Sequence, residues 1–438
     1  MAQAAKLPGV KVLVLGSGAR EHALVTGLAA DPGVDALYAA PGNPGMAQEC
    51  EVRSVAMTDP EAVVALAQEL AVDLVVIGPE APLVAGVGNA LREARVAVFG
   101  PDAAAAELEG SKAFAKEIMD AAGVPTSQSV AATSLAECEE AFDRFGAPHV
   151  VKADGLAAGK GVVVTSDRDE ALAHARACLA EADRVVIEDF LDGPEVSLFV
   201  LCDGTTTVPL APAQDFKRAL NGDEGPNTGG MGAYTPLPWA PEGLVDDVIA
   251  QVAQPVVDEM ARRGTPFVGL LYCGLALTKN GIEVIEFNAR FGDPETQAVL
   301  QRLTSPLGTV LHAAATGELA QLPPLEWADK SAVTVVMAAE NYPASPAKGD
   351  VITGIDQANA LEDVHVFHAG TSSTEGGELT TSGGRVLSVT ALGADLADAR
   401  ARAYEAVGLI QWRGEHHRTD IAQRAEENRI TIPQGGSR

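Results

Sequence analysis

Apolar residues in the first hundred positions gather into short continuous runs, separated by segments with helical spacing. Runs at residues 12–15, 73–77 and 96–99 are typical of strands buried on both faces. Residues 20–30 and 81–94 have the apolar spacing of helices. Strands that alternate with helices form a parallel sheet covered by helices on both faces. The pattern therefore predicts an N-terminal parallel α/β domain.

Farther along the chain, apolar runs come in pairs that are joined by tight-turn dipeptides. Asp203-Gly204 and Asn280-Gly281 each stand between two runs of strand-forming residues. Such dipeptides are strong signals of β-hairpins, because the favoured two-residue turn needs a positive φ at both positions. The middle of the chain is therefore expected to contain antiparallel sheets.

The last quarter of the chain has a different organisation. Residues 321–325, with two adjacent prolines, have the composition of a linker. Beyond them, strand patterns at residues 333–337, 364–367 and 385–390 precede a helical pattern at residues 395–407. This arrangement predicts a small C-terminal α+β domain. The expected domains of this α/β and α+β multidomain chain are residues 1–107, 108–325 and 326–438, the last with a polar tail.

The strand predicted at residues 284–290 alternates between polar and apolar side chains. Because successive side chains of a strand point to opposite faces, Glu286, Asn288 and Arg290 share one face. The other face carries Ile285, Phe287 and Ala289. Side chains two positions apart lie roughly 6–7 Å apart, so a carboxylate and an amide oxygen can reach one Mg²⁺ ion. The guanidinium adds a fork for phosphate. A solvated edge strand is the alternative, but this ligand set favours a metal–phosphate site.

Two glycine-rich segments are candidate phosphate sites. Residues 152–161, KADGLAAGKG, resemble a P-loop, but the glycine spacing is one residue short and a strand pattern follows. We interpret them as a hairpin loop that folds over phosphates and supplies Lys152 and Lys160. Gly16-Ser17-Gly18 lacks the third glycine of a dinucleotide-binding motif, since Glu21 stands there. This turn is equally compatible with anion binding and with a plain strand–helix connection.

Composition narrows the classes of function. A formal net charge of −29 opposes nucleic-acid binding, which depends on Lys and Arg neutralising phosphates. The sequence has no secretion signal and no run of about 20 apolar residues, which argues against a membrane span. The five cysteines are scattered without a C-x-x-C pair, as in reduced cytoplasmic enzymes rather than disulfide or zinc proteins. We therefore expect a cytoplasmic protein with small-molecule ligands.

Together these segments resemble ATP-grasp enzymes, and among them the phosphoribosylamine–glycine ligase family. The resemblance runs from about residue 11 to residue 425 and includes LEGSK (108–112), KADGLAAGKG (152–161) and EDFLDGPEVS (188–197). More specific segments are GAREHAL (18–24), GPNTGGMGAY (225–234) and EFNARFGDPETQ (286–297). The resemblance implies that residues 108–325 form an ATP-grasp domain with a lid at about residues 125–195.

The family resemblance also implies which residues contact each ligand. ATP would be bound by Lys112, Lys152, Gly159, Lys160, Glu188, Phe190, Leu191 and Glu195. Mg²⁺ or Mn²⁺ would be bound by Glu286 and Asn288, in agreement with the strand pattern. Catalysis would depend on Lys217, Arg290 and Asp293. The substrates would contact Gly18, Arg20, Glu21, Glu80, Asp215, Asn227, Thr228, Gly229, Gly230 and Met231.

The reaction of that family needs no nucleophile from the protein. ATP would phosphorylate the glycine carboxylate to glycyl phosphate, and the amine of 5-phosphoribosylamine would then displace phosphate. Glycine and 5-phosphoribosylamine are thus the expected partners, without nucleic acid, membrane or an obligate protein partner. The chain departs from the family pattern at Ala339-Glu340-Asn341, which replaces a glycine-containing turn.

Three other functions remain open at this point. Another ATP-grasp enzyme would keep the ATP site but use bicarbonate or formate. A nucleotide-binding regulatory module would not turn over, although the intact Lys152, Glu286 and Asn288 argue against it. A nicotinamide dehydrogenase is disfavoured by the missing third glycine. His22 is equally compatible with a substrate contact and with a structural role.

Overall fold

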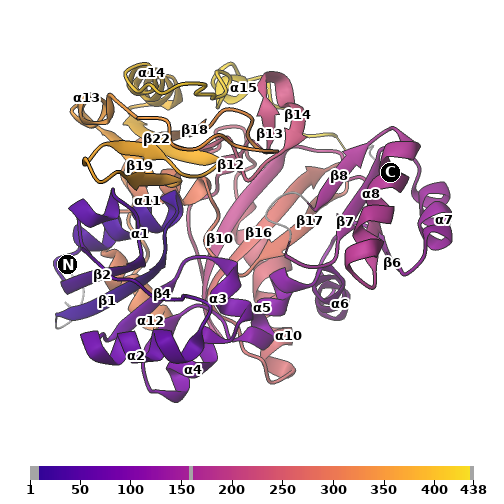
Figure 1. Cartoon of the computed structure of the whole chain (residues 1–438). Coiled ribbons are helices and arrows are strands. Elements are labelled where there is room, and N and C mark those ends of the chain that lie inside the picture. The colour runs from indigo at the N-terminus through magenta and orange to yellow at the C-terminus, as the bar shows by residue number, and fades with distance from the viewer. Residues whose placement is uncertain (1–8, 157–160, 435–438) are drawn as a thin grey trace.

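The computed structural model describes residues 9–156 and 161–434 (Figure 1). Its N-terminal part confirms the predicted parallel sheet, with strand order β3-β2-β1-β4-β5. The strands are β1 (Val10–Gly16), β2 (Val34–Pro41), β3 (Glu51–Val52), β4 (Leu74–Ile77) and β5 (Ala97–Phe99). Leu13 and Leu15 pack into one core cluster and Val12 and Val14 into another. Both faces of β1 are therefore buried, as its continuous apolar run indicates.

The helices of this domain differ from the sequence prediction in one place. They are α1 (Ala19–Ala29), α2 (Pro60–Leu70), α3 (Glu80–Val84) and α4 (Val87–Glu93). The single helix predicted at residues 81–94 is wrong, because Gly86 has φ +80° and this left-handed conformation interrupts the helix. Within the described residues, every helix falls short of the length and hydropathy that a membrane crossing requires.

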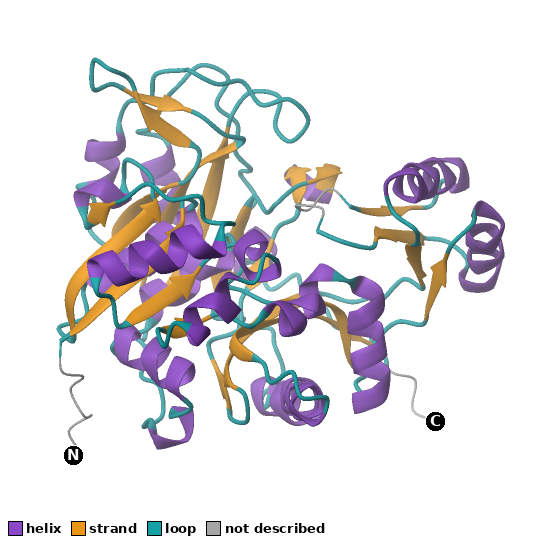
Figure 2. Cartoon of the chain, turned by 60° about the horizontal axis from the view of Figure 1, so that its bottom comes forward, coloured by secondary structure: helices purple, strands orange, loops and turns teal. Residues whose placement is uncertain are grey.

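A separate lobe follows α5 (Ala103–Gly110) and α6 (Lys112–Ala122). Its antiparallel sheet has the order β6-β9-β7-β8, and α7 (Leu135–Phe145) and α8 (Arg168–Glu181) cover it. The strands are β6 (Ser129–Ala132), β7 (His149–Ala153), β8 (Val162–Thr165) and β9 (Val185–Glu188). The lobe has its own core, which includes Phe142, Val151 and Ile187. It stands at one side of the molecule in Figures 1 and 2. We call it the lid lobe, after the lid that the family resemblance predicts at about residues 125–195.

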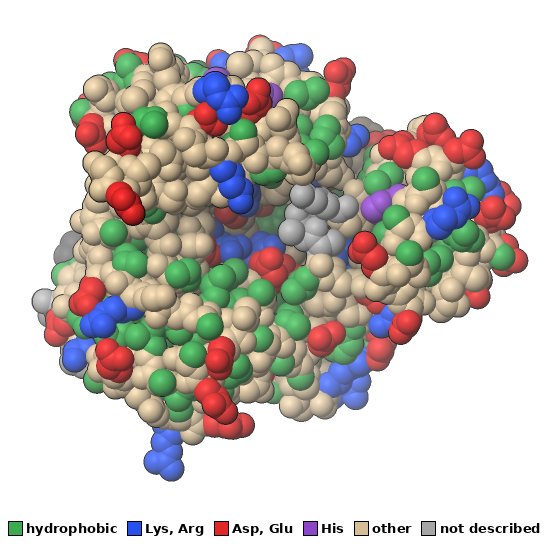
Figure 3. Space-filling model, in the orientation of Figure 1, with side chains coloured by type: hydrophobic (Ala, Val, Ile, Leu, Met, Phe, Trp, Pro, Cys, Tyr) green, Lys and Arg blue, Asp and Glu red, His purple; other side chains and the backbone are tan. Residues whose placement is uncertain are grey.

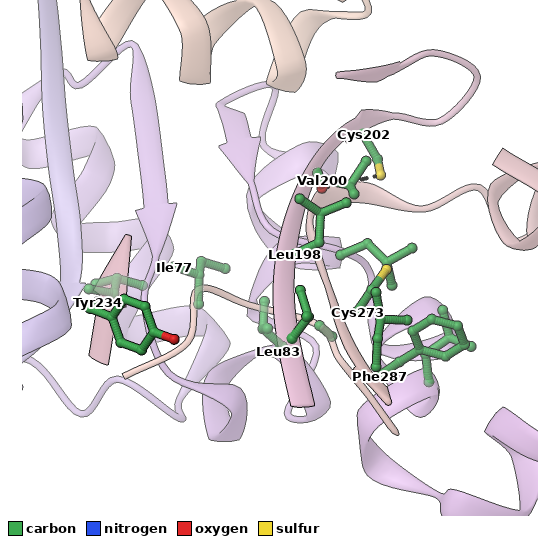
Figure 4. Packing of buried hydrophobic residues seen from close by; sticks show 14 of the residues in the cluster. Ile77, Leu83, Leu198, Val200, Cys202, Tyr234, Cys273 and Phe287 are labelled. Carbon is green, nitrogen blue, oxygen red and sulfur yellow. Dashed lines mark hydrogen bonds between the residues drawn. The ribbon is translucent and has the colours of Figure 1, made fainter. Parts of the chain in front are cut away.

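The central antiparallel sheet, of order β11-β10-β16-β17, confirms both predicted hairpins. Its strands are β10 (Glu195–Asp203), β11 (Thr207–Pro209), β16 (Val268–Thr278) and β17 (Gly281–Asn288). One face packs on α9 (Leu244–Val248), a π-helix (Ile249–Ala253) and α10 (Gln254–Arg262), with Leu198, Cys273 and Phe287 in the same core cluster (Figure 4). The other face packs on α12 (Leu307–Thr316) and reaches the core of the N-terminal domain.

The strand that carries the predicted metal ligands has a β-bulge. Gly274 pairs with Glu286, but the next residue of β16, Leu275, pairs with Val284, so Ile285 has no register partner. Val284, rather than Ile285, is therefore fully buried in the core with Phe287. β17 also ends at Asn288, two residues before the predicted end. The bulge leaves the predicted polar face intact at Glu286 and Asn288, since pairing is regular between them.

The last sheet crosses the expected boundary at residue 325, with strand order β12-β15-β18-β22-β19. β12 (Gln214–Asp215) and β15 (Gly232–Thr235) precede the boundary, and β18 (Ser331–Ala338), β19 (Val364–His368) and β22 (Arg385–Gly393) follow it. α14 (Leu396–Val407) packs on β18 and β22, while α11 (Glu295–Arg302) lies between α1 and this sheet. The shorter elements are the hairpins β13 (Arg218–Leu220) with β14 (Glu224–Asn227) and β20 (Thr371–Ser373) with β21 (Leu379–Thr381), and the helices α13 (Ile355–Asn359) and α15 (Gln423–Glu426).

Candidate active site

A hollow opens at the centre of the molecule between the main body and the lid lobe, with basic and acidic side chains on its floor (Figure 3). Glu286 on β17 is electrostatically the best defined of the predicted ligands. Burial acts to raise the pKa of its carboxyl, but Lys217, Lys112 and Lys152 together lower it below its usual range. Glu286 is therefore ionised at neutral pH. With Asn288 on the same face, it offers oxygen ligands that suit a hard divalent cation.

Lys152 connects the lid lobe to the bulge of β17. Its ammonium donates to the backbone oxygen of Ile285 at 2.9 Å and pairs with Glu188 at 2.9 Å. These contacts use two of the three N–H donors of the ammonium and leave the third for an anion. The bulge thus places a backbone acceptor beside the ammonium of Lys152, which is predicted to contact ATP. The sequence pattern did not reveal this arrangement.

The side chain of Glu188 faces lysines. Lys116 lies 3.4 Å from Glu188, and burial lowers the pKa of Lys116 to about 8. Burial acts to raise the pKa of Glu188, but Lys152 and Lys116 outweigh it and lower the pKa. Phe190, just beyond β9, is 44% exposed, so its ring is open to contact with a flat ligand. Because these lysines occupy its carboxylate, the predicted contact of Glu188 with ATP would involve its backbone.

Lys217 joins Glu195, which is predicted to contact ATP, to Asp215, which is predicted to contact the substrates. Lys217 forms a close ion pair with Glu195 and lies 3.7 Å from Asp215. Burial opposes the charge on Lys217, but Asp215 and Glu195 hold its pKa well above the ordinary value. Burial raises the pKa of Asp215 to about 7, against the opposing effect of Lys217. Lys217 therefore stays cationic between a residue predicted to contact ATP and one predicted to contact the substrates.

Arg290 is held by two carboxylates from different elements. Its guanidinium lies 2.9 Å from Glu109 on α5 and 3.3 Å from Glu80 on α3. Glu109 also accepts the backbone N–H of Ala289 at 2.8 Å. Although burial opposes the charge, Glu109 and Glu80 keep the pKa of Arg290 above its usual value. Sequence reasoning missed Glu109, whose only signal was its place in LEGSK, three residues before Lys112.

Residues 227–231, which are predicted to contact the substrates and which we call the acceptor loop, are tied to Lys217 and to the lid lobe. The backbone N–H and the hydroxyl of Thr228 both donate to the carbonyl of Lys217 at 2.8 Å. Met231 donates its N–H to the carbonyl of Phe216 at 2.7 Å. Asn227 donates its side-chain amide to the carbonyl of Val162 on β8 at 3.0 Å. The loop therefore contacts both residues 216–217 and the lid lobe.

The turn between β1 and α1 is held by a carboxylate from the first turn of α1. The carboxylate of Glu21 accepts the N–H of Gly18 at 2.7 Å and pairs with Arg20. Arg20 also donates to the carbonyl of Phe291 at 3.1 Å, which connects the turn to the motif after β17. The N–H of Gly18 is therefore already occupied within the turn, and anion binding there stays a prediction. Gly159 and Lys160 lie outside the described residues.

His22 packs between the N-terminal and C-terminal domains. The backbone N–H of His368 donates to its Nδ1 at 2.8 Å, so Nε2 must carry the proton and donates to Glu49 at 2.9 Å. His365 completes a His–Glu–His group whose ligand atoms lie within 4.8 Å of one another. A neutral ring with Nδ1 accepting has no lone pair on Nε2 for a metal. The contacts therefore support the structural role for His22.

Comparison with known proteins distinguishes among the ATP-grasp alternatives. Family models described as the N domain, the ATP-grasp (A) domain and the C domain of phosphoribosylglycinamide synthetase match residues 10–109, 110–296 and 332–424. The chain belongs to this family. The predicted fold class and the resemblance are both confirmed, and the chain is an ATP-grasp ligase.

Relatives match over their whole length. The phosphoribosylamine–glycine ligase of Streptomyces coelicolor is 62% identical over 95% of this chain and 99% of its own. The Mycobacterium tuberculosis (strain H37Rv) ligase is 55% identical over 97% and 100%, respectively. The crystal structure of the Thermotoga maritima ligase, 33% identical, covers 94% of this chain and 100% of that chain with a TM-score of 0.82. The biotin carboxylase domain of Hydrogenobacter thermophilus 2-oxoglutarate carboxylase, 17% identical, shares the fold alone, with a TM-score of 0.70 over 96% and 98% of the two chains.

Proposed function

We propose that this chain joins glycine to 5-phosphoribosylamine in purine biosynthesis, with conversion of ATP to ADP and phosphate. The observation that carries the proposal is the group of charges around β17. There the ionised Glu286 lies close enough to Lys217, Lys112 and Lys152 for their charges to lower the pKa of its carboxyl. The full-length relatives that carry this activity in their names support the choice of substrates. A ligase that uses bicarbonate or formate is not favoured by these relatives.

The chemistry follows from bringing three charged ligands together. A carboxylate oxygen of glycine attacks the γ-phosphorus of ATP, the bond to ADP breaks, and glycyl phosphate forms. The amine nitrogen of 5-phosphoribosylamine then attacks the acyl carbon, loses a proton, and displaces inorganic phosphate. Lys152 and Lys217 would supply positive charge to the phosphoryl oxygens. The lid lobe would exclude water from the acyl phosphate.

We propose Glu286 and Asn288 as the residues that hold the divalent cation, either Mg²⁺ or Mn²⁺. A carboxylate and an amide oxygen are hard ligands, and both ions prefer oxygen donors. A cation held there would screen the negative charge of the phosphoryl group as it transfers. We place the reaction in the cytoplasm, because the five cysteines, four of them buried, are all free.

A component-omission assay tests the proposed function. ADP release is measured with Mg²⁺-ATP, glycine and freshly generated 5-phosphoribosylamine, and each component is then left out in turn. We expect release to require all three components. Release that does not depend on glycine, or that bicarbonate or formate supports equally well, would overturn the proposal.

A further inference from the structure

Two side chains of the C-terminal domain reach the predicted acceptor loop. Arg385 is the first residue of β22, and Tyr342 follows β18 in the turn where this chain departs from the family pattern. The sheet makes this approach possible, because β18 pairs with both β15 and β22. The acceptor loop leads directly into β15, so the C-terminal strands carry their side chains towards it.

Arg385 binds two segments that carry predicted site residues, namely the acceptor loop and the motif that follows β17. Its Nη1 donates to the carbonyl of Gly229 at 2.5 Å and to the carbonyl of Asp293 at 2.9 Å. Its Nη2 lies 3.1 Å from Oδ2 of the same Asp293. A guanidinium has five donors in a rigid plane, so one side chain can fix these acceptors relative to one another. A lysine has the charge but not that geometry.

Tyr342 fixes the other backbone group of Gly229. The N–H of Gly229 donates to the Tyr342 hydroxyl at 3.0 Å. A Cβ on Gly229 would lie 3.1 Å from Cζ of Arg385, so the guanidinium lies against the glycine. Both peptide groups that flank this residue are thus held by C-terminal side chains. The nearby residues Thr228 and Met231 instead donate their backbone N–H groups to the carbonyls of Lys217 and Phe216.

We propose that Arg385 and Tyr342 are positioning residues that hold Gly229 and Asp293 in the arrangement that receives 5-phosphoribosylamine. The identity of that acceptor rests on the proposed function. Glycine has the greatest conformational freedom of any residue, so Gly229-Gly230 needs external contacts to keep one conformation. Asp293 has a second contact, the side-chain amide of Gln297 at 2.8 Å, which leaves Arg385 to set its orientation towards the loop.

The kinetics of Arg385→Lys, Arg385→Ala and Tyr342→Phe test this proposal. Loss of a charge-assisted hydrogen bond weakens binding by roughly ten- to a hundred-fold. We expect the arginine variants to raise the KM for 5-phosphoribosylamine by at least about ten-fold, while the KM for ATP changes by less than about two-fold. Arg402→Ala is the matched control, since Arg402 pairs with Asp398 on the outer helix α14 and should leave all three KM values unchanged.

Two further readouts separate positioning from stability. Millimolar ethylguanidinium should restore part of the activity of Arg385→Ala, because it replaces the missing fork. The double variant Arg385→Lys/Tyr342→Phe should lose less than the product of the single losses, since both side chains hold Gly229.

The possible outcomes distinguish this proposal from the proposed function. If the unaltered protein does not use glycine and 5-phosphoribosylamine, the proposed function fails. If it does, and the KM for 5-phosphoribosylamine in Arg385→Lys and Tyr342→Phe stays within about two-fold, the positioning role is wrong. If Arg385→Ala does not fold by circular dichroism, the two conservative variants alone decide the matter.

Discussion

Glu286 is the residue on which the proposed metal site depends most. Its carboxylate is half-buried, yet three lysines lower its pKa and keep it charged. The same lysines would repel one another without it, so the carboxylate and the cations stabilise a common arrangement. This balance is typical of sites that bind a metal together with phosphates.

Glu286→Gln should therefore abolish turnover without unfolding the protein. The amide has the same shape but no charge, so the metal loses its anionic ligand. We expect kcat to fall by at least about a hundred-fold, as for loss of a principal electrostatic group. The control is Glu283→Gln on the same strand, whose carboxylate accepts from Thr278. An active Glu286→Gln variant with an unchanged metal requirement would contradict the assignment.

At the level of elements, local sequence signals predicted the strands well and their irregularities poorly. Asp203-Gly204 and Asn280-Gly281 marked the hairpins, because turn chemistry is local. The bulge at Ile285 depends on pairing with β16, which the sequence of β17 does not contain. Arg385 lies 156 residues from Gly229 and 92 from Asp293, so no local pattern could join them. Contacts between distant segments decide the rest of the site.

Gly230 tests whether the acceptor loop has one required conformation. It has φ +111°, and a Cβ there would lie 2.4 Å from Cδ of Pro294. Gly230→Ala should therefore displace the loop and lower kcat/KM for 5-phosphoribosylamine by at least about ten-fold. Gly243→Ala is the control for backbone strain alone, since Gly243 has φ +83° and no atom within 4 Å of the added Cβ. Equal kinetic effects in the two variants would contradict a specific role of the loop.

At the scale of the whole molecule, the lid lobe has its own core. The other domains are connected by a sheet that crosses the boundary at residue 325 and by hydrogen bonds between domains. The C-terminal sheet includes strands that precede residue 325, and His22 of α1 accepts from His368 on β19. The family models divide the chain at similar places, but the fold connects these parts across each division. The division into three domains, with boundaries at residues 107 and 325, stays a prediction from the sequence. The sequence could not indicate that the C-terminal domain supplies contacts to the acceptor loop.

The interface at His22 should make the stability of the protein depend on acid pH. Burial lowers the pKa of His22, and it lowers the pKa of His368 to about 3. A histidine in the unfolded chain has a pKa of about 6.5. Below that pH the unfolded state binds more protons, so stability falls as the pH drops from about 6.5 towards 3. His22→Asn keeps an acceptor for the N–H of His368 and cannot be protonated. Its melting temperature should decline less than that of the unaltered protein between pH 7 and pH 4.5, and parallel declines would contradict the account.

The transfer of oxygen from glycine to phosphate tests the central claim most directly. The protein is supplied with ATP, 5-phosphoribosylamine and glycine labelled with ¹⁸O in both carboxylate oxygens, and the released phosphate is analysed by mass spectrometry. A glycyl phosphate intermediate predicts that each phosphate carries one ¹⁸O, while the amide product keeps the other. Phosphate without ¹⁸O would show that the carboxylate is not phosphorylated and would contradict the account.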